Sequence, residues 1–213
     1  MNACYNTWRK EESEFKHKDI ETEYKNILSP EEYRKLLSLF DLHLNEAKHQ
    51  HNMYFDTESL RLKANHSALR IRLSDTYAHL TYKQSLTNAK SLEVTDKVSQ
   101  ASAQAMMETG QFQPGANLSA LFQEIGLDAS ELRTIGQFKT TRLEKNWKKQ
   151  KLVLDACSFY TYNDYELELE VEPGEDDPKR YFNEFLSSYH ITRRPSKPKI
   201  ARMQLDKPLY PFE

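Results

Sequence analysis

The feature that most constrains the fold is a strict alternation of charged and apolar residues in several short segments. Four glutamates occupy every second position from 166 to 172, and leucine and valine fill the positions between them. Successive side chains of a β-strand point to opposite sides of a sheet, so a period of two predicts a strand with one acidic and one apolar face. The segment therefore predicts a strand over residues 165–172.

Similar patterns predict further strands, and breaks between them predict helices. The predicted strands are 19–28, 53–57, 68–73, 78–83, 92–95, 136–142, 151–155 and 165–172. Ser29-Pro30, followed by Glu32, is typical of a helix start, and Asp177-Pro178 predicts another. Residues 100–127 predict two helices that end at Gly110 and Gly126. We expect these two helices to pack on the outside of the sheet.

The charged faces separate by sign. Glu21, Glu23 and Lys25 share one face of the first strand, and Arg70 and Arg72 share a face of another. A sheet with its charges in water is the ordinary explanation for one such strand. A row of glutamates on one face is repulsive, however, and a divalent cation would remove that repulsion. If the sheet closes into a barrel, these faces meet inside it.

Such an interior suits a metal-bound polyphosphate. Carboxylates are the ligands that Mg²⁺ or Mn²⁺ prefers, and Arg and Lys bind phosphate oxygens. The near-neutral net charge of −2, from 30 basic and 32 acidic residues, argues against a nucleic-acid partner. No apolar run is long enough for a membrane span, and we expect a cytoplasmic protein. The two cysteines predict free thiols, and the scattered histidines do not predict a zinc site.

The sequence resembles the CYTH domain family, also called triphosphate tunnel metalloenzymes. Glu21-Thr22-Glu23-Tyr24-Lys25 matches the family's Glu-x-Glu-x-Lys signature. Other segments resemble the family's motifs in the same order along the chain: Tyr54-Phe55-Asp56-Thr57, Leu69-Arg70-Ile71-Arg72, Lys83, Glu93, Arg142, Leu154-Asp155, Glu166-Leu167-Glu168 and Lys199. The resemblance spans residues 21–199 and is greatest to small stand-alone bacterial members.

The resemblance implies an α+β fold with a closed or nearly closed antiparallel β-barrel of about eight strands and helices outside it. It also implies Mg²⁺- or Mn²⁺-dependent hydrolysis of a small triphosphate. The implied phosphate-binding residues are Lys25, Arg70, Arg72, Lys83, Arg142 and Lys199. The implied metal ligands are Glu21, Glu23, Asp155, Glu166 and Glu168, with Glu93 and Glu170 as further candidates. The glutamate run is longer than the family needs, so the metal-binding pair can lie two residues further on. We expect Asp56 to have a structural role.

Two alternatives to a triphosphatase remain open at this point. One is an adenylate cyclase of the same family, which converts ATP to cyclic AMP, and the other is a polyphosphate-binding module without turnover. Residues 1–18 predict a flexible extension, and residues 19–213 predict a single domain. We expect a monomer or a homodimer.

Overall fold

The chain forms an α+β structure around a closed antiparallel β-barrel. The computed structural model describes residues 18–172 and 177–211. Within them, neighbouring strands follow the order β1-β5-β4-β3-β2-β6-β7-β8, and β8 pairs with β1 to close the barrel. The strands are β1 (Lys18–Leu28), β2 (Lys48–Thr57), β3 (Ser67–Ser74), β4 (Ala78–Ser85), β5 (Lys90–Val98), β6 (Leu132–Trp147), β7 (Gln150–Ser158) and β8 (Asn163–Glu170). The predicted eight-stranded barrel is confirmed.

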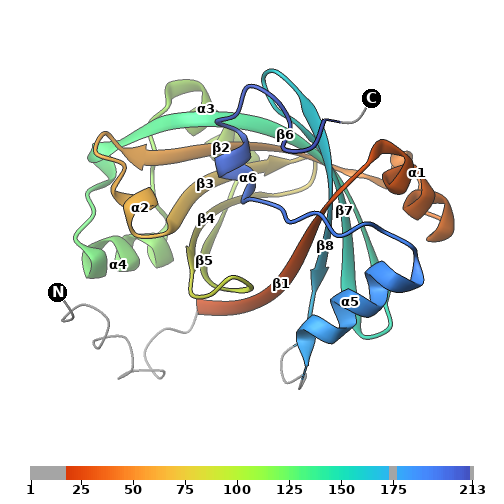
Figure 1. Cartoon of the computed structure of the whole chain (residues 1–213). Helices are drawn as coiled ribbons and strands as arrows, with labels where there is room; N and C mark the ends of the chain where they lie inside the picture. The colour runs from red at the N-terminus through yellow and green to blue at the C-terminus, as the bar shows by residue number, and fades with distance from the viewer. Residues whose placement is uncertain (1–17, 173–176, 212–213) are drawn as a thin grey trace.

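Helices cover the barrel on two sides (Figure 1). In the described residues they are α1 (Pro30–Leu39), α2 (Arg61–Ala64), α3 (Gln100–Thr109), α4 (Ala116–Ile125), α5 (Pro178–Ser188) and α6 (Lys199–Arg202). Figure 1 shows α1 and α5 on the right of the barrel and α2 and α4 on the left, with α6 in front. Two 3₁₀ helices, 44–46 and 129–131, lie just before β2 and β6. None of the helices in the described part of the chain has the length and apolar content that crossing a bilayer requires.

The helix ends follow the predicted local chemistry. Ser29 caps α1, since its hydroxyl accepts a hydrogen bond from the Glu32 backbone N–H while the Glu32 carboxylate accepts one from the Ser29 N–H. Gly110 and Gly126 end α3 and α4 with positive φ angles of 69° and 62°, which cost glycine little. Asp177 caps α5. The predicted starts of α1 and α5 and the ends of α3 and α4 are confirmed.

One hydrophobic core lies outside the barrel, under α2, α3 and α4. Leu69 and Ile71 of β3 are fully buried there. They pack in one cluster with apolar residues of the helices, among them Leu118 of α4. Side chains alternate along a strand, so this packing turns Arg70 and Arg72 to the inside of the barrel. The expectation that α3 and α4 pack outside the sheet is confirmed.

A second core lies outside β1, β7 and β8. Leu167 and Leu169 of β8 have no exposed surface and pack with Phe182 and Phe185 of α5. Burial of a leucine or phenylalanine side chain contributes roughly 1.5–3 kcal/mol, so these contacts set which face of β8 points outward. The alternate residues of β8, which are glutamates, therefore point inward. The strand register depends on the apolar residues, and the inner charges follow from it.

A cluster of three aromatic rings and one cysteine, here called the closing cluster, fills one end of the barrel. It consists of Tyr54, Phe138, Cys157 and Phe159. Ile200 and Met203, from α6 and the residue after it, pack against it. The Tyr162 hydroxyl donates a hydrogen bond of 2.6 Å to the Arg202 carbonyl and so ties α6 to the barrel. The short helix in the C-terminal segment thus lies against one end of the barrel.

Asp56 has the predicted structural role. Its carboxylate accepts hydrogen bonds from the backbone N–H groups of Thr57, Leu62 and Lys63 at 2.7–3.0 Å. These donors lie before and within α2, so Asp56 joins β2 to that helix.

Some boundaries differ from the sequence-based expectations. The strand predicted over 136–142 is the 16-residue β6, which runs from Leu132 to Trp147. The glutamate-rich strand ends at Glu170 rather than at residue 172. Neither α2 nor α6 was predicted, since each has only four residues. Of the predicted N-terminal extension, residues 1–17 lie outside the described residues.

Candidate functional site

Strand pairing brings the inward charges of β6, β7, β8 and β1 side by side. Asp155 of β7 lies opposite Arg142 of β6 on one side and opposite Glu166 of β8 on the other. Glu168 of β8 lies opposite Lys25 of β1. Directly opposed residues have Cβ atoms about 4.5–5.5 Å apart, so their side chains interact. The barrel register alone therefore assembles a compact group of acids and bases.

Three of these acids form a cluster, here called the acidic triad. Asp155, Glu166 and Glu168 each place one carboxylate oxygen within 4.8 Å of the others. Asp155 and Glu166 are fully buried, and Glu168 is 3% exposed. Hard oxygen donors at this spacing fit Mg²⁺ or Mn²⁺. Within the described residues it is the one group of three or more acidic, histidine or cysteine side chains close enough to hold a metal ion.

Two cations contact the triad from the same chain. The Lys199 ammonium lies 2.8 Å from Asp155 and 2.6 Å from Glu168, and it also contacts Glu166. The Arg142 guanidinium donates two hydrogen bonds to Asp155, at 2.8 and 2.6 Å, and one of 2.8 Å to Glu168. The charge of the triad is thus already neutralised in large part by side chains that can also bind phosphate.

These contacts keep Asp155 and Glu168 ionised. Burial alone raises the pKa of Glu168, but Lys199, Lys25 and Arg142 outweigh it and hold that pKa well below its usual range. Burial likewise raises the pKa of Asp155, yet Arg142 and Lys199 leave it lowered. Both groups are therefore carboxylates at neutral pH, which is the form that binds metal.

A second cluster surrounds Lys83 and is here called the Lys83 cluster. The Lys83 ammonium lies 2.7 Å from Glu23, 2.7 Å from Glu93 and 3.1 Å from Glu21. Burial lowers the pKa of Lys83, but the three carboxylates raise it further than burial lowers it. Lys25 connects this cluster to the triad, because its ammonium lies 3.1 Å from Glu23 and 3.0 Å from Glu168.

Arg70 and Arg72, here called the arginine pair, are compensated unequally. Burial lowers the pKa of Arg70, but Tyr54 and Glu93 outweigh it and leave that pKa raised, whereas Arg72 has no such balance. Among residues 18–172 and 177–211, no carboxylate lies within ion-pair distance of either guanidinium, and Nε of Arg70 has no hydrogen-bond partner. Nε of Arg72 donates a hydrogen bond of 2.9 Å to the Asn52 side chain. Burial, together with Arg70 and Arg142, lowers the pKa of Arg72 to about 10. The half-buried positive charge of Arg72, close to Arg70 and Arg142, is unfavourable, so this part of the interior is suited to an anionic ligand.

The predicted site residues thus fall into three neighbouring groups inside the barrel. Glu21 and Glu23, predicted as metal ligands, lie around Lys83 rather than in the triad. Glu170 lies outside the triad and pairs with Lys151 at 3.1 Å. The geometry therefore favours Glu166 and Glu168 over a pair shifted by two residues. The roles of these residues stay predictions.

Sequence reasoning missed two charged residues that border the triad. Arg202, fully buried in α6, lies 2.9 Å from Glu166 and 2.5 Å from Asp164. The alternation of β8 places Asp164 on the same face as Glu166, so this acid could have been found by extending the predicted strand by one residue. Arg202 had no such signal, because its position depends on how α6 packs on the barrel.

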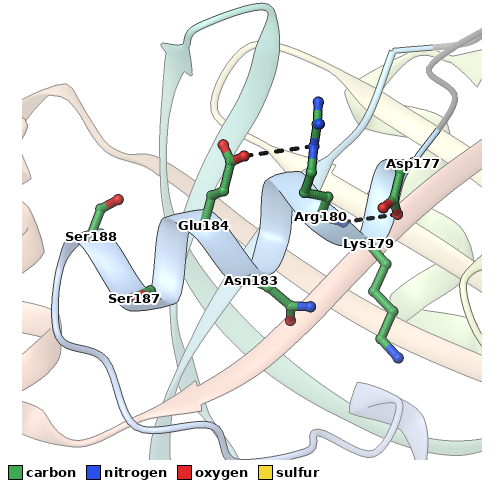
Figure 2. A pocket seen from close by; sticks show the side chains of 7 residues that line it. All are labelled: Asp177, Lys179, Arg180, Asn183, Glu184, Ser187 and Ser188. Carbon is green, nitrogen blue, oxygen red and sulfur yellow. Dashed lines mark hydrogen bonds and ion pairs between the residues drawn. The ribbon is translucent and has the colours of Figure 1, made fainter.

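A surface depression of about 530 Å³ runs along α5 and is not part of this site (Figure 2). Figure 2 shows that its side chains come from the outer face of one helix. The Arg180 side chain pairs with Glu184, and the Arg180 backbone N–H donates a hydrogen bond to the carboxylate of the helix cap Asp177. Exposed ion pairs of this kind contribute little and bring no catalytic set together. The chemistry-bearing side chains lie in the barrel interior.

The fold and the interior define a closed β-barrel protein whose inner surface carries a cluster of carboxylates beside arginine and lysine side chains. Comparison with known families identifies it further, since the CYTH domain matches residues 19–203. The chain belongs to the CYTH domain family.

Individual relatives span nearly the whole chain. It is 30% identical over 189 residues to the "Putative triphosphatase YjbK" of Bacillus subtilis, covering 89% of this chain and 96% of that protein. Among solved structures, a "putative adenylate cyclase" from Bacillus halodurans is 30% identical with a TM-score of 0.80, covering 89% of this chain and all of that chain. The "putative adenylyl cyclase HpAC1 from Hippeastrum", said to reveal a dominant triphosphatase activity, is 25% identical with a TM-score of 0.72, covering 87% and 94%.

Proposed function

We propose that this chain hydrolyses a triphosphate compound with Mg²⁺ or Mn²⁺ inside its β-barrel. One observation carries the proposal: the buried acidic triad and the arginine pair lie in the same barrel interior. A triphosphate bound to a divalent cation needs both kinds of group at once. The triphosphatase names of two relatives support the same reaction class.

In this proposal the acidic residues bind the metal ion and the basic residues bind the phosphate chain. Asp155, Glu166 and Glu168 hold the cation, which supplies Lewis-acid stabilisation of phosphate oxygens and lowers the pKa of a bound water. Lys25, Lys83, Arg142 and Lys199, together with the arginine pair, bind the phosphate chain. Glu21, Glu23 and Glu93 orient Lys83 toward it. Glu21 and Glu23 become metal ligands only if a second cation binds.

The chemical step is transfer of a phosphoryl group to water. The water oxygen bonds to a terminal phosphorus, the bond from that phosphorus to the bridging oxygen breaks, and the diphosphate leaves with the electron pair. Negative charge builds up on the bridging oxygen and on the non-bridging oxygens. Arginine and lysine fixed in a low-dielectric interior stabilise that charge without reorganising, which is the most effective form of electrostatic catalysis.

The test is phosphate release from inorganic triphosphate and from ATP, each with Mg²⁺, Mn²⁺ or EDTA. We expect release that depends on the metal. Glu168→Gln should lower it by at least about 100-fold, because the variant loses a charged ligand. Titration calorimetry should show weaker Mn²⁺ binding in the same variant.

Glu170→Gln is the matched comparison, since Glu170 lies on the same face of β8 two residues further on. Loss of activity and Mn²⁺ binding in Glu168→Gln alone supports the triad. Loss of activity and Mn²⁺ binding in Glu170→Gln alone would place the metal site two residues further along β8. Wild-type protein that releases no phosphate from either substrate under any condition contradicts the proposed hydrolysis.

The name of the Bacillus halodurans relative favours a second candidate, which is cyclisation of ATP. Product analysis separates the two. Cyclisation yields cyclic AMP and pyrophosphate, whereas hydrolysis yields orthophosphate. Substrate binding without either product would leave a polyphosphate-binding module.

A further inference from the structure

Inside the barrel, exposure rises from the α6 end toward the opposite rim. The closing cluster and α6 fill one end, where Arg202 is fully buried. At the other end the inward side chains of Lys48 and Lys151 are 48% and 39% exposed, and they flank Glu144. These three residues define the exposed rim. A substituent carried by a triphosphate at the arginine pair reaches solvent over this rim, because the other end is filled.

Two aromatic rings lie at that rim, next to the arginine pair. His79 is directly opposite Arg72 in the β3–β4 pairing and points inward with it. The rings of His79 and Tyr77 are 4.7 Å apart with an interplanar angle of 37°. Tyr77 lies in the turn between β3 and β4, which places the ring pair beyond Arg72 along the barrel.

The ring pair is held in place from the neighbouring strand. The Gln50 side-chain amide donates a hydrogen bond of 2.8 Å to the Tyr77 hydroxyl, and Gln50 is 3% exposed. Tyr77 and His79 themselves are half-buried, so one side of the pair remains accessible. A fixed aromatic surface beside the Arg72 guanidinium, whose pKa is lowered by burial and by neighbouring cations, suits a ligand with an anionic part and a ring.

The charges around His79 also favour a ring-binding role for its side chain. Burial and the nearby cations Arg72, Lys97 and Arg70 lower the pKa of His79. The imidazole is therefore neutral at neutral pH and presents an aromatic face rather than a further cation.

We propose that the Tyr77–His79 pair binds the ring of an organic triphosphate of the nucleoside triphosphate class, whose phosphates lie at the arginine pair. The inference rests on the proposed function and narrows its substrate class. Stacking on such a pair adds binding energy for an organic triphosphate and adds none for inorganic triphosphate. The structure thus predicts a preference that the phosphate-binding residues alone cannot produce.

The test compares kcat/KM for ATP and for inorganic triphosphate in wild-type protein and in Tyr77→Ala, His79→Ala and Tyr77→Phe. Alanine at either position should lower kcat/KM for ATP by about 5- to 100-fold, which is the usual effect of removing one stacking partner. The value for inorganic triphosphate should change by less than about 2-fold, within the range of mutations that remove no contact. Tyr77→Phe keeps the ring but loses the hydrogen bond from Gln50, so its ATP preference should lie between those of wild type and Tyr77→Ala.

Tyr160→Ala is the matched control, because Tyr160 is 99% exposed and lies away from the rim. An equal loss for both substrates in Tyr77→Ala and His79→Ala overturns the inference, as does no loss for ATP. If neither substrate is hydrolysed, the proposed hydrolysis fails on its own. Titration of ATP and inorganic triphosphate onto the same variants then decides the inference. A selective loss of ATP binding in the alanine variants supports it. ATP binding equal to that of wild type contradicts it.

Discussion

The Glu23 carboxylate should contribute stability that disappears in acid. Burial raises the pKa of Glu23, but Lys25 and Lys83 outweigh both burial and the repulsion from Glu168 and lower it from 4.5 to about 2. Because the folded state favours the ionised form, this contribution is complete above the unfolded pKa and is lost as the pH falls toward the folded value. At about 1.4 kcal/mol per pH unit, it amounts to about 3 kcal/mol at neutral pH.

Glu23→Gln removes that contribution, because glutamine does not titrate. The free-energy difference between wild type and variant should be about 3 kcal/mol larger at about pH 7 than under fully protonating conditions. It should fall by about half by about pH 3, which is between the two pKa values. Urea-induced unfolding, followed by circular dichroism at a series of pH values, measures this difference. Other acids with lowered pKa, such as Asp155, are present in both proteins and largely cancel.

Glu46→Gln is the control, since Glu46 is exposed in the short helix after α1. It should change the free energy of unfolding by less than about 0.5 kcal/mol at any pH tested. The reasoning is refuted if the difference in free energy of unfolding between wild type and Glu23→Gln stays constant from neutral pH to about pH 3. It would mean that Lys25 and Lys83 do not hold Glu23 ionised in the folded protein.

Two further predictions concern charges with opposite roles. Arg72→Met should weaken inorganic triphosphate binding by roughly 10- to 100-fold in calorimetry. It should also raise the melting temperature, because relief of the repulsion from Arg70 and Arg142 outweighs the lost hydrogen bond to Asn52; a lower melting temperature would contradict the cost assigned to that half-buried cation. Asp56→Ala should lower the free energy of unfolding by about 2–3 kcal/mol, since three backbone N–H groups lose their acceptor. Asp75→Ala, at an exposed turn, is its control, and equal effects of the two substitutions would argue against the structural role of Asp56.

Much of the fold was predictable because local pattern and long-range packing agree. The alternation in β8 is strict, and Leu167 and Leu169 find an apolar surface on α5, so period and burial select the same face. Ser29 and Pro30 likewise place the start of α1 through contacts within four residues. Such signals need no knowledge of the barrel.

The arrangement of the inner charges was less predictable. Glu21 and Glu23 match a metal-binding motif, but the pairing of β1 with β5 and β8 brings both of them to Lys83. No local pattern specifies which acid meets which base across strands far apart in sequence. The same limit applies to α6, whose four residues carry no helix period and whose place depends on Tyr162 and the closing cluster.

Because both hydrophobic cores lie outside the barrel, the residues that stabilise the fold and the residues that face the ligand alternate along each strand. On β3, Leu69 and Ile71 belong to the outer packing, while Arg70 and Arg72 belong to the interior. Substitution of the inner residues can therefore change ligand preference while the helices keep the same surface to pack on. A lineage can alter chemistry at every second position and retain the scaffold at the others, which allows proteins of one architecture to diverge in substrate without passing through unfolded intermediates.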